Sequence, residues 1–272
     1  MKPEPTDILY GEIKVHQPLE GRGPRVSVDT VLLAHFARVK ERAKVMELGC
    51  AHGAVSLIMA RRAPRAFFEG IDINPSLVEL ALRNARLNGM EERVSFSAAD
   101  LREHRRDFEA ETYDTVVMNP PYDEPGSSRP SPDAGMATAM HGEQCTLEDA
   151  VICAKYLLRN GGKFFLVMRA KRLGELFCLL HRHNVKPKRM RAVHPKPGRA
   201  ASVVLVEAKR ASGDGVSVEP PLFIYGADGN YTEELLAAYK LEDCPQTADK
   251  TSGAARTRQG ASSLDPLTQC RS

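Results

Sequence analysis

Between residue 44 and about residue 208, short runs of β-branched and aromatic residues alternate with longer segments of helical period. The strand-like runs occupy residues 44–48, 66–72, 94–99, 113–119, 163–169, 188–194 and 202–208. The clearest helical segments occupy residues 54–62, 75–89 and 146–162. This alternation is typical of a parallel sheet with helices on both faces. The pattern therefore predicts an α/β domain over residues 44–210, built on a mostly parallel sheet of seven strands.

Local signals refine this prediction at two places. Only PKPGRAA, residues 195–201, separates the last two strands. Because this connection is too short for a crossover helix, we expect those strands to pair antiparallel at one edge of the sheet. In the segment 75–89, Pro75 follows Asn74 at a first-turn position and Gly89 stands where the helix should end.

The two flanks differ from the central region. Residues 1–43 contain a polar, glycine-containing lead-in and then the apolar patch VLLAHFARV, which predicts a helix capped by Asp29 or Thr30. We expect this lead-in to lie on the substrate side of the domain. Residues 211–240 should pack on the domain as a C-terminal extension. Residues 241–272 are small and polar, which predicts disorder.

Composition narrows the class of protein. The 272 residues are 42% apolar, and 38 Lys and Arg against 35 Asp and Glu give a net charge of +3. Any affinity for nucleic acid must therefore come from a local surface. No apolar run approaches the roughly 18 residues of a membrane span, and the start lacks a secretory signal, which predicts a cytoplasmic protein. The six cysteines form no C-x-x-C pair, so we expect no metal site.

A glycine-containing loop follows the first strand of the central region, in the sequence Glu47-Leu48-Gly49-Cys50-Ala51-His52-Gly53. Glycines permit a sharp turn and a close approach of the backbone to a ligand, and the helix that follows offers free amides. The dinucleotide pattern G-x-G-x-x-G is not met, since its positions hold Gly49, Ala51 and Ala54. A phosphate cradle is therefore disfavoured.

Acidic residues stand at the ends of three successive strands: Glu47, Asp72 and Asp100. Open α/β sheets bind ligands at this edge, and three acids there suit a cationic ligand that carries a ribose. Asp72 can accept from two ribose hydroxyls and Asp100 from an exocyclic amine, while Glu47 can act on the loop or on an ammonium group. The alternative is that acids after strands cap helices, above all for Asp100.

The fourth strand ends in Asn119-Pro120-Pro121-Tyr122. The prolines hold the chain extended, so the Asn119 side-chain oxygen and the Pro120 carbonyl can point into one cleft. Two fixed acceptors can grip a planar NH2 group and turn its lone pair toward an electrophile. Tyr122 offers a face on which a flipped-out base can stack. An ordinary Pro-Pro turn is the alternative.

With ELGCAHG, GIDIN and SAADL, the tetrapeptide NPPY resembles the class I S-adenosylmethionine-dependent methyltransferases that modify amino nitrogens. The whole chain resembles the bacterial tRNA(Val) adenine-37 N6-methyltransferase group, through Gln17, RVSVDTVLLAHFA, MHGE, GGKFFLVMRAKRLGEL and HPKPGRAASVVLVEAKR followed by PPLFIYGADGNYTEELLAAY. The resemblance implies a Rossmann-like fold and S-adenosylmethionine as cofactor. It implies cofactor contacts at Glu47, Gly49, Ala51, Gly53, Asp72, Ile73, Asp100, Leu101 and Asn119, and a target amine held by Asn119, Pro120 and Tyr122.

The substrate that this chemistry favours is adenine N6 in RNA, most of all in tRNA. Glutamine N5 in a protein of the release-factor type and guanine N2 in ribosomal RNA carry the same kind of amine and remain alternatives. A non-catalytic RNA-binding module that keeps the fold is an alternative of another class, and a nicotinamide dehydrogenase is disfavoured by the loop.

A basic stretch supports RNA over protein. Residues 176–206 contain no acid, and they carry Lys186, Lys188, Arg189, Arg191, Lys196 and Arg199. They predict a local positive surface for a phosphate backbone, unless acids from elsewhere in the fold balance them. The segment 123–142, rich in Pro, Gly and Ser, adds Arg129 and His141 as candidate phosphate contacts.

Overall fold

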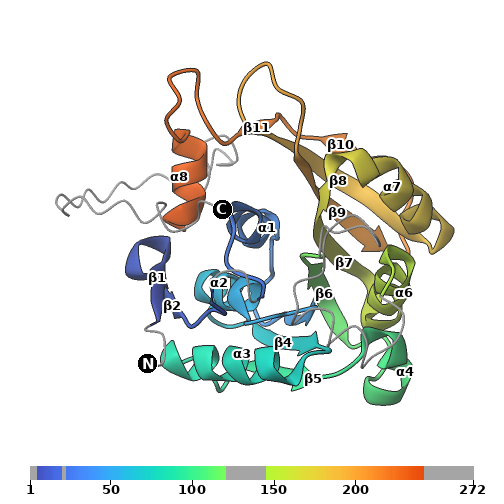
Figure 1. The fold of residues 1–272 in the computed structure, drawn as a ribbon. Coiled ribbons are helices and arrows are strands. Elements are labelled where there is room, and N and C mark those ends of the chain that lie inside the picture. Colours follow the sequence, from blue (N-terminus) through green and yellow to red (C-terminus); the bar gives the residue numbers. More distant parts are fainter. Residues whose placement is uncertain (1–4, 20–22, 121–144, 242–272) are drawn as a thin grey trace.

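A nine-stranded sheet forms the centre of the molecule in a computed structural model, which describes residues 5–19, 23–120 and 145–241 (Figure 1). Its principal strands are β3 (Lys44–Leu48), β4 (Phe67–Asp72), β5 (Val94–Ala98), β6 (Tyr113–Met118), β7 (Leu158–Arg169), β8 (Val185–His194) and β9 (Val203–Arg210). Their order is β8-β9-β7-β6-β3-β4-β5, and the short strands β10 (Ser217–Val218) and β11 (Leu222–Phe223) pair with β8. The predicted mostly parallel α/β sheet is confirmed.

The antiparallel pairing of the last two strands is also confirmed, and the pair lies at one end of the row of principal strands, as expected. Strand β9 runs antiparallel to both β7 and β8 and lies between them. Strand β8 is therefore parallel to β7, and its carboxyl end lies at the same edge as those of β3, β4 and β6. The short connection 195–201 closes a hairpin at that edge.

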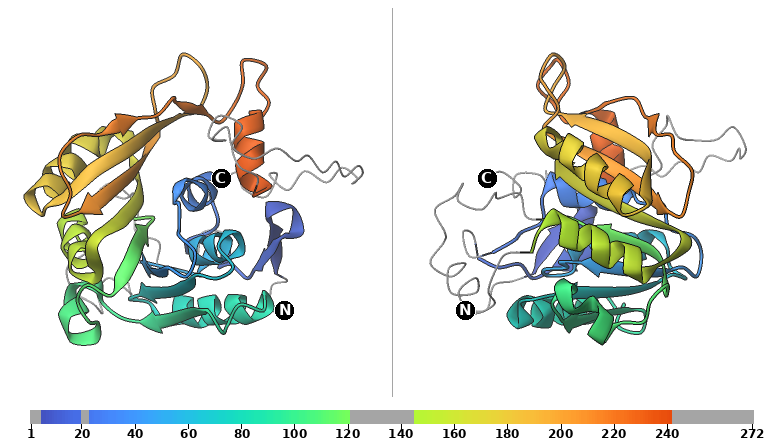
Figure 2. Two further views of the ribbon diagram at one scale, coloured as in Figure 1. Left: turned by 180° about the vertical axis from the view of Figure 1, so that it is seen from behind. Right: turned by 90° about the vertical axis from the view of Figure 1, so that its right-hand side faces the viewer.

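Helices cover both faces of the sheet, as predicted. One hydrophobic cluster joins the sheet to α1 (Val28–Phe36), α2 (Ala54–Arg62), α3 (Pro75–Leu87) and α8 (Glu233–Tyr239). A second cluster joins the other face to α6 (Leu147–Leu157) and α7 (Leu173–Arg182), next to the short α4 (His104–Asp107). Figure 2 shows α6 and α7 outside the sheet and α1 and α2 within its curve. Single turns η1 (Leu9–Gly11), η2 (Leu101–Glu103) and η3 (Ala170–Arg172) complete the described elements.

Two helix boundaries differ from the expectations, and one helix was not predicted. Helix α1 begins at Val28 and its cap is Ser27, not Asp29 or Thr30, because Ser27 has extended backbone and exchanges capping hydrogen bonds with Thr30. Helix α6 ends at Leu157 and β7 starts at once, since Leu158 already has extended backbone, and Gly161 further on adopts a φ of +77°. Helix α7 was not among the predicted segments. In α3 the Asn74 cap and the terminating Gly89, with φ +62°, are as expected.

An N-terminal hairpin stands apart from the main sheet. Strands β1 (Thr6–Ile8) and β2 (Ile13–Val15) pair with each other, and the hairpin lies beside α3 (Figure 1). At the other end of the described chain, α8 packs on α1. The expectations for the 123–142 loop and for the tail beyond residue 241 concern residues outside the described ones. Among the described helices, none has both the length and the apolar character to span a membrane.

Candidate functional site

The ends of four adjacent parallel strands form the candidate site. Leu48 of β3 pairs with Ile71 of β4 and with Met118 of β6, and Asp72 pairs with Ala98 of β5. We call the segments that leave these four strand ends the carboxyl edge. The register brings the loop after Leu48, the pair Asp72-Ile73, the Asp100 segment and Asn119 to this one edge, as the sequence predicts.

The loop after β3 is held by the neighbouring strand. Its Cys50 amide donates to the Ile71 carbonyl at 2.9 Å, and its Ala51 amide donates to Asp72 Oδ2 at 2.8 Å. Gly49 has a φ of +67°, and a Cβ built there would meet nothing within 4 Å. The backbone at Gly49 is thus open to a ligand on that side. Ala51 has a φ of +49°, a conformation that costs an L-residue roughly 1–2 kcal/mol.

Gly53 is required for a different reason. It ends the loop with φ +82°, and a Cβ on it would lie 2.6 Å from Phe96 Cζ and 3.2 Å from Ala81 Cβ. Any side chain there would push α2 away from α3 and β5. The glycine therefore sets the close packing that brings the start of α2 to the carboxyl edge.

Glu47 lies beneath the loop and is buried. Its Oε2 accepts hydrogen bonds from the Ser56 amide at 2.9 Å and from Ser56 Oγ at 2.5 Å. Burial raises its pKa to about 8, although the Ser56 hydrogen bonds act in the opposite direction. These hydrogen bonds fix the first turn of α2, directly after the loop, and the two roles expected for Glu47, on the loop or on an ammonium group, stay predictions.

Asp72 offers the acceptors that a ribose needs. Its Oδ2 accepts from Ala51 and its Oδ1 accepts from the Asn74 amide at 2.9 Å. A carboxylate has about four lone-pair sites, so sites remain for two vicinal hydroxyls. Burial raises the pKa of this carboxyl group. Ile73, next along the chain, is 41% exposed, and this apolar side chain suits the flat face of an adenine.

Asp100 is already engaged in the structure. It caps η2 by accepting from the Arg102 amide at 2.9 Å, and its carboxylate forms an ion pair with the Arg102 guanidinium at 2.6 Å. Leu101 beside it is buried. The capping alternative is therefore realised, while a contact between Asp100 and an adenine amine stays a prediction.

Asn119 follows β6 and lies against α1. Its Nδ2 donates to Thr30 Oγ1 over 3.5 Å, and Thr30 is buried. In this orientation the amide nitrogen faces the protein, and Oδ1 is the side-chain acceptor that remains for a ligand. No pattern in the sequence pointed to this contact of Thr30. Pro120 directly follows Asn119, and Tyr122 lies outside the described residues.

The basic stretch on β8 differs from its prediction. Arg189 forms ion pairs with Glu207 at 2.9 Å and Glu219 at 3.1 Å, and it stacks on the Phe36 ring at 3.7 Å. Arg191 is only 7% exposed and pairs with Glu234 at 2.5 Å. Acids from β9 and from the C-terminal extension therefore balance both guanidinium groups. We correct their assignment from phosphate contacts to structural ion pairs.

The other basic candidates divide into two groups. Lys186 pairs with Asp214 at 3.2 Å, and Lys188 donates to the carbonyls of Gly213 and Asp214, so both are tied to the segment after β9. Lys196 and Arg199 are exposed in the 195–201 hairpin at the edge where β8 ends. Arg129 and His141 lie outside the described residues.

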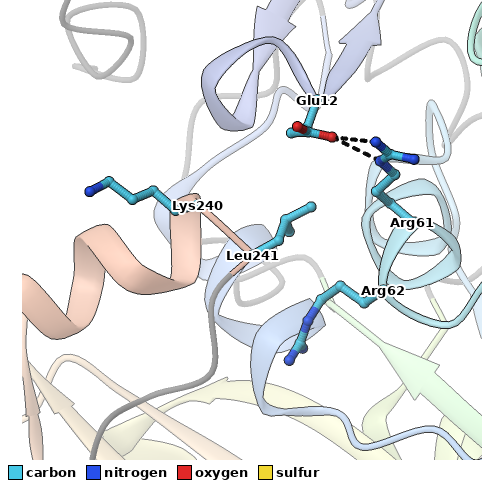
Figure 3. A pocket seen from close by; sticks show the side chains of 5 residues that line it. All are labelled: Glu12, Arg61, Arg62, Lys240 and Leu241. Atoms are coloured by element: carbon cyan, nitrogen blue, oxygen red, sulfur yellow. Dashed lines mark hydrogen bonds and ion pairs between the residues drawn. The ribbon is translucent and has the colours of Figure 1, made fainter. Parts of the chain in front are cut away.

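A pocket of about 450 Å³ lies between η1, the end of α2 and the end of α8, lined by Glu12, Arg61, Arg62, Lys240 and Leu241 (Figure 3). Arg61 is paired with Glu12, and Arg62 donates to the carbonyls of Ala34 and His35. Figure 3 shows the cationic groups pointing to different sides. The pocket stands at the C-terminal end of α2, away from the loop, and no candidate residue lines it.

No group of three His, Cys, Asp or Glu side chains in the described ranges is arranged to hold a metal ion. The described residues at the carboxyl edge instead fit an organic ligand with a ribose. They supply free carboxylate lone pairs at Asp72, an exposed apolar side chain at Ile73 and open backbone at Gly49.

Comparison with known proteins gives matches of two kinds. The family model of the methyltransferase small domain matches residues 25–182. Curated proteins that carry the name tRNA1(Val) (adenine(37)-N6)-methyltransferase are similar over most of their length. The one from Porphyromonas gingivalis is 27% identical over 241 residues, with 85% of this chain and 93% of that protein covered. The one from Yersinia enterocolitica is 26% identical, with 78% and 83% covered.

Solved structures share the fold. A predicted O-methyltransferase from Agrobacterium tumefaciens aligns with a TM-score of 0.64 at 22% identity and covers 78% of this chain and 96% of its own. The [4+2]-cyclase SpnF aligns with a TM-score of 0.52 at 15% identity, covering 68% and 81%. Because the second protein is named for a cyclisation, the fold by itself does not settle the reaction.

Proposed function

Because the chain belongs to the methyltransferase small domain family, an S-adenosylmethionine-dependent class, we propose that it transfers a methyl group to the N6 amine of an adenine in transfer RNA. The observation that carries the proposal is Asn119 at the carboxyl edge, with its nitrogen toward Thr30 and its oxygen left to accept. The names of the curated relatives from P. gingivalis and Y. enterocolitica support adenine and tRNA.

The cofactor would be held by the loop and by the strand ends beside it. S-adenosylmethionine supplies an activated methyl group on a positively charged sulfur. Asp72 is proposed to bind the ribose hydroxyls, Ile73 and Leu101 to contact the adenine, and Gly49, Ala51 and Gly53 to line the methionine part. Glu47 acts beneath them by fixing the start of α2, and Asp100 is proposed to accept from the adenine amine.

Catalysis requires alignment rather than a strong base. The Asn119 oxygen and the Pro120 carbonyl would accept the two hydrogens of the target amine, which turns its lone pair toward the methyl group. The same two oxygens would stabilise the positive charge that develops on the nitrogen, and the methylated amine would then release its extra proton to water. Thr30 holds the Asn119 amide so that its oxygen is the atom presented. Tyr122 is proposed to stack on the flipped-out base.

Lys196 and Arg199 are the proposed phosphate contacts among the described basic candidates. They are exposed and stand on a hairpin at the end of β8, on the edge that carries Asn119. Each phosphate that these residues neutralise should steepen the slope of log association constant against log salt concentration by about one unit. Arg129 and His141, in the segment after Asn119-Pro120-Pro121-Tyr122, are also proposed to contact phosphates.

The test is incubation of the protein and methyl-labelled S-adenosylmethionine with total RNA from a strain that lacks the protein, followed by nucleoside mass spectrometry. We expect labelled N6-methyladenosine in the tRNA fraction. RNA from the parent strain, already modified, is the matched control and should take up little label. Label in N2-methylguanosine, or only in protein glutamine, would replace the proposed substrate by one of its alternatives. An Asn119→Ala protein that labels RNA at the full rate would remove the proposed mechanism.

A further inference from the structure

Asn84 of α3 is a polar residue on a helix face that otherwise packs in the hydrophobic cluster, and it is 0% exposed. Its Oδ1 accepts from the His16 amide at 2.7 Å, and its Nδ2 donates to the His16 carbonyl at 3.0 Å. The same Nδ2 donates to the His52 carbonyl of the cofactor loop at 2.9 Å. One side chain thus joins the N-terminal segment, α3 and the loop.

A second asparagine provides a natural comparison. Asn88, one turn further along α3, accepts from the Lys14 amide at 3.0 Å and donates to the Lys14 carbonyl at 2.7 Å. Four helical residues rise about 6 Å and two extended residues about 6.8 Å, so two side-chain amides can pair with alternate residues of the N-terminal segment, Lys14 in β2 and His16 just after it. Both asparagines hold the hairpin on α3, but the hydrogen bonds of the Asn88 side chain go to Lys14 and to the Asn84 carbonyl and not to the loop.

The segment that Asn84 holds continues to the reaction residue. Gln17, next to His16, accepts from the Val26 amide through Oε1 at 2.8 Å. Val26 leads into Ser27, which exchanges capping hydrogen bonds with Thr30. Thr30 in turn accepts from Asn119. Hydrogen bonds and short stretches of chain therefore connect Asn84 to the amide that would grip the substrate.

In the other direction, the contact at His52 leads to the cofactor residues. His52 follows Ala51, whose amide donates to the Asp72 carboxylate. Loss of Asn84 would leave the His16 amide, the His16 carbonyl and the His52 carbonyl without this partner in a buried place, so the two segments would no longer share a fixed position.

We infer that Asn84 is a positioning residue that couples occupancy of the cofactor loop to the order of residues 23–30 and, through Thr30, to Asn119. The inference rests on the proposed function for its consequence, which is that cofactor and RNA strengthen each other's binding. The coupling itself is a property of the protein chain and can be measured without RNA.

The experiment is amide hydrogen exchange with and without S-adenosylhomocysteine, read by mass spectrometry. In the wild-type protein we expect the ligand to slow exchange in residues 49–53 and also, by about tenfold, in residues 23–30, within the range of roughly 5- to 150-fold typical of coupled sites. Asn84→Ala should lose the slowing in 23–30. Asn88→Ala, the matched control, should keep it.

A second variant is needed because Asn84 is buried and Asn84→Ala could fail to fold. Gln17→Ala removes a half-buried link further along the same path and should also lose the slowing in 23–30 while keeping it in 49–53. The inference is overturned if wild-type 23–30 does not respond to the ligand, or if the response persists in Asn84→Ala or, should that protein not fold, in Gln17→Ala. If exchange responds to the ligand as expected but the protein methylates no RNA, the proposed function is rejected and the coupling is still supported.

Discussion

The charged residues of the carboxyl edge and those of β8 end in different surroundings after folding. Asp72 stands at a strand end and keeps lone-pair sites for a ligand, with backbone amides as its neighbours. Arg189 and Arg191 stand inside a strand, and acids from other segments take up both guanidinium groups. A residue at the end of a parallel strand lies at the edge of the sheet, and this position does not depend on which other segments pack nearby. The exposure of a residue within a strand depends on what covers it.

The partners of β8 explain why a count of charges along the sequence misleads. Arg189 meets Glu207 and Glu219, which lie 18 and 30 residues away, and Arg191 meets Glu234, which lies 43 residues away. None of these acids belongs to residues 176–206, so the absence of acids in that window says little about the folded surface. Position within an element is the better guide to function here.

The largest expected effect comes from Asn119→Ala at the carboxyl edge. Removing the oxygen that is proposed to hold the amine should lower kcat by about 100- to 1,000-fold, the usual effect of losing one preorganised hydrogen-bonding group. The dissociation constant for S-adenosylmethionine should stay nearly unchanged. Single-turnover kinetics with unmodified tRNA and calorimetry with the cofactor measure the two quantities.

Asp72→Ala is the control at the same edge and should show the opposite pattern. It removes the proposed ribose acceptors and so should raise the dissociation constant for the cofactor. A variant pair in which both substitutions weaken cofactor binding equally would contradict separate roles for the two strand ends.

A smaller effect, on stability, is expected from Arg191→Met in β8. It removes the ion pair with Glu234 and the hydrogen bond to the Pro220 carbonyl, so it should lower the free energy of unfolding by about 2 kcal/mol. RNA affinity should not change. Lys196→Met is the matched control on the exposed hairpin, with a change in unfolding free energy within about 0.5 kcal/mol and a smaller salt slope of RNA binding.

Denaturant unfolding and RNA binding at several salt concentrations separate the two variants. If Arg191→Met weakens RNA binding while the fold keeps its stability, the structural assignment of this arginine is wrong. The double variant Arg191→Met with Glu234→Gln should recover part of the lost stability, because it also removes the negative charge that the arginine balanced.

Much of the fold was predictable because its signals are local. The alternation of strands and helices, the Asn74 cap and Gly89 all act within a few residues. Helix α7 gave no such start signal, since its cap position is Arg172 and no side chain caps it. The cap of α1 was misplaced because Ser27 precedes the apolar patch by four residues.

The candidate site divides in the same way. The strand ends placed Asp72 and Asn119 correctly at one edge, because register and parallel topology suffice for that. Thr30 and Asn84 were missed, because their partners lie 89 and 68 residues away and no local pattern announces them. The only sequence feature related to these contacts is the pair Asn84 and Asn88, four residues apart on an amphipathic helix, which hold the N-terminal hairpin on α3.

A pH-dependent effect is expected from Glu47→Gln beneath the loop. Burial raises the pKa of Glu47 to about 8 in the folded protein, against 4.5 for the ordinary group. Between these values the unfolded chain binds fewer protons than the folded one, so this group makes the free energy of unfolding fall as pH rises. Glutamine does not titrate, so the variant should gain stability relative to wild type from pH 5 to 8, by at most about 1.4 kcal/mol per pH unit.

Unfolding curves in urea at a series of pH values measure this difference. Burial lowers the pKa of the neighbouring His52 to about 4, which gives a slope of opposite sign below pH 6.5, but both proteins share it and it cancels in the difference. Parallel curves for the two proteins would mean that Glu47 is ionised in the folded state, and the carboxyl edge would then carry one more negative charge for a cationic ligand.

The smallest effect is expected from Ala51→Gly, which tests whether the backbone conformation of residue 51 alone determines what that residue contributes to stability. Glycine removes the cost of roughly 1–2 kcal/mol for a φ of +49°, offset by roughly 0.5–1 kcal/mol of extra chain entropy in the unfolded state. The variant should be more stable by up to about 1 kcal/mol in denaturant unfolding, and the backbone hydrogen bond to Asp72 should remain. Ala54→Gly, at the first helical position of α2, should change stability in the opposite direction. Equal destabilisation by both would mean that the Ala51 methyl group makes contacts that hold the loop. The stability of this edge would then depend on packing with other segments, as the exposure of Arg189 and Arg191 in β8 does.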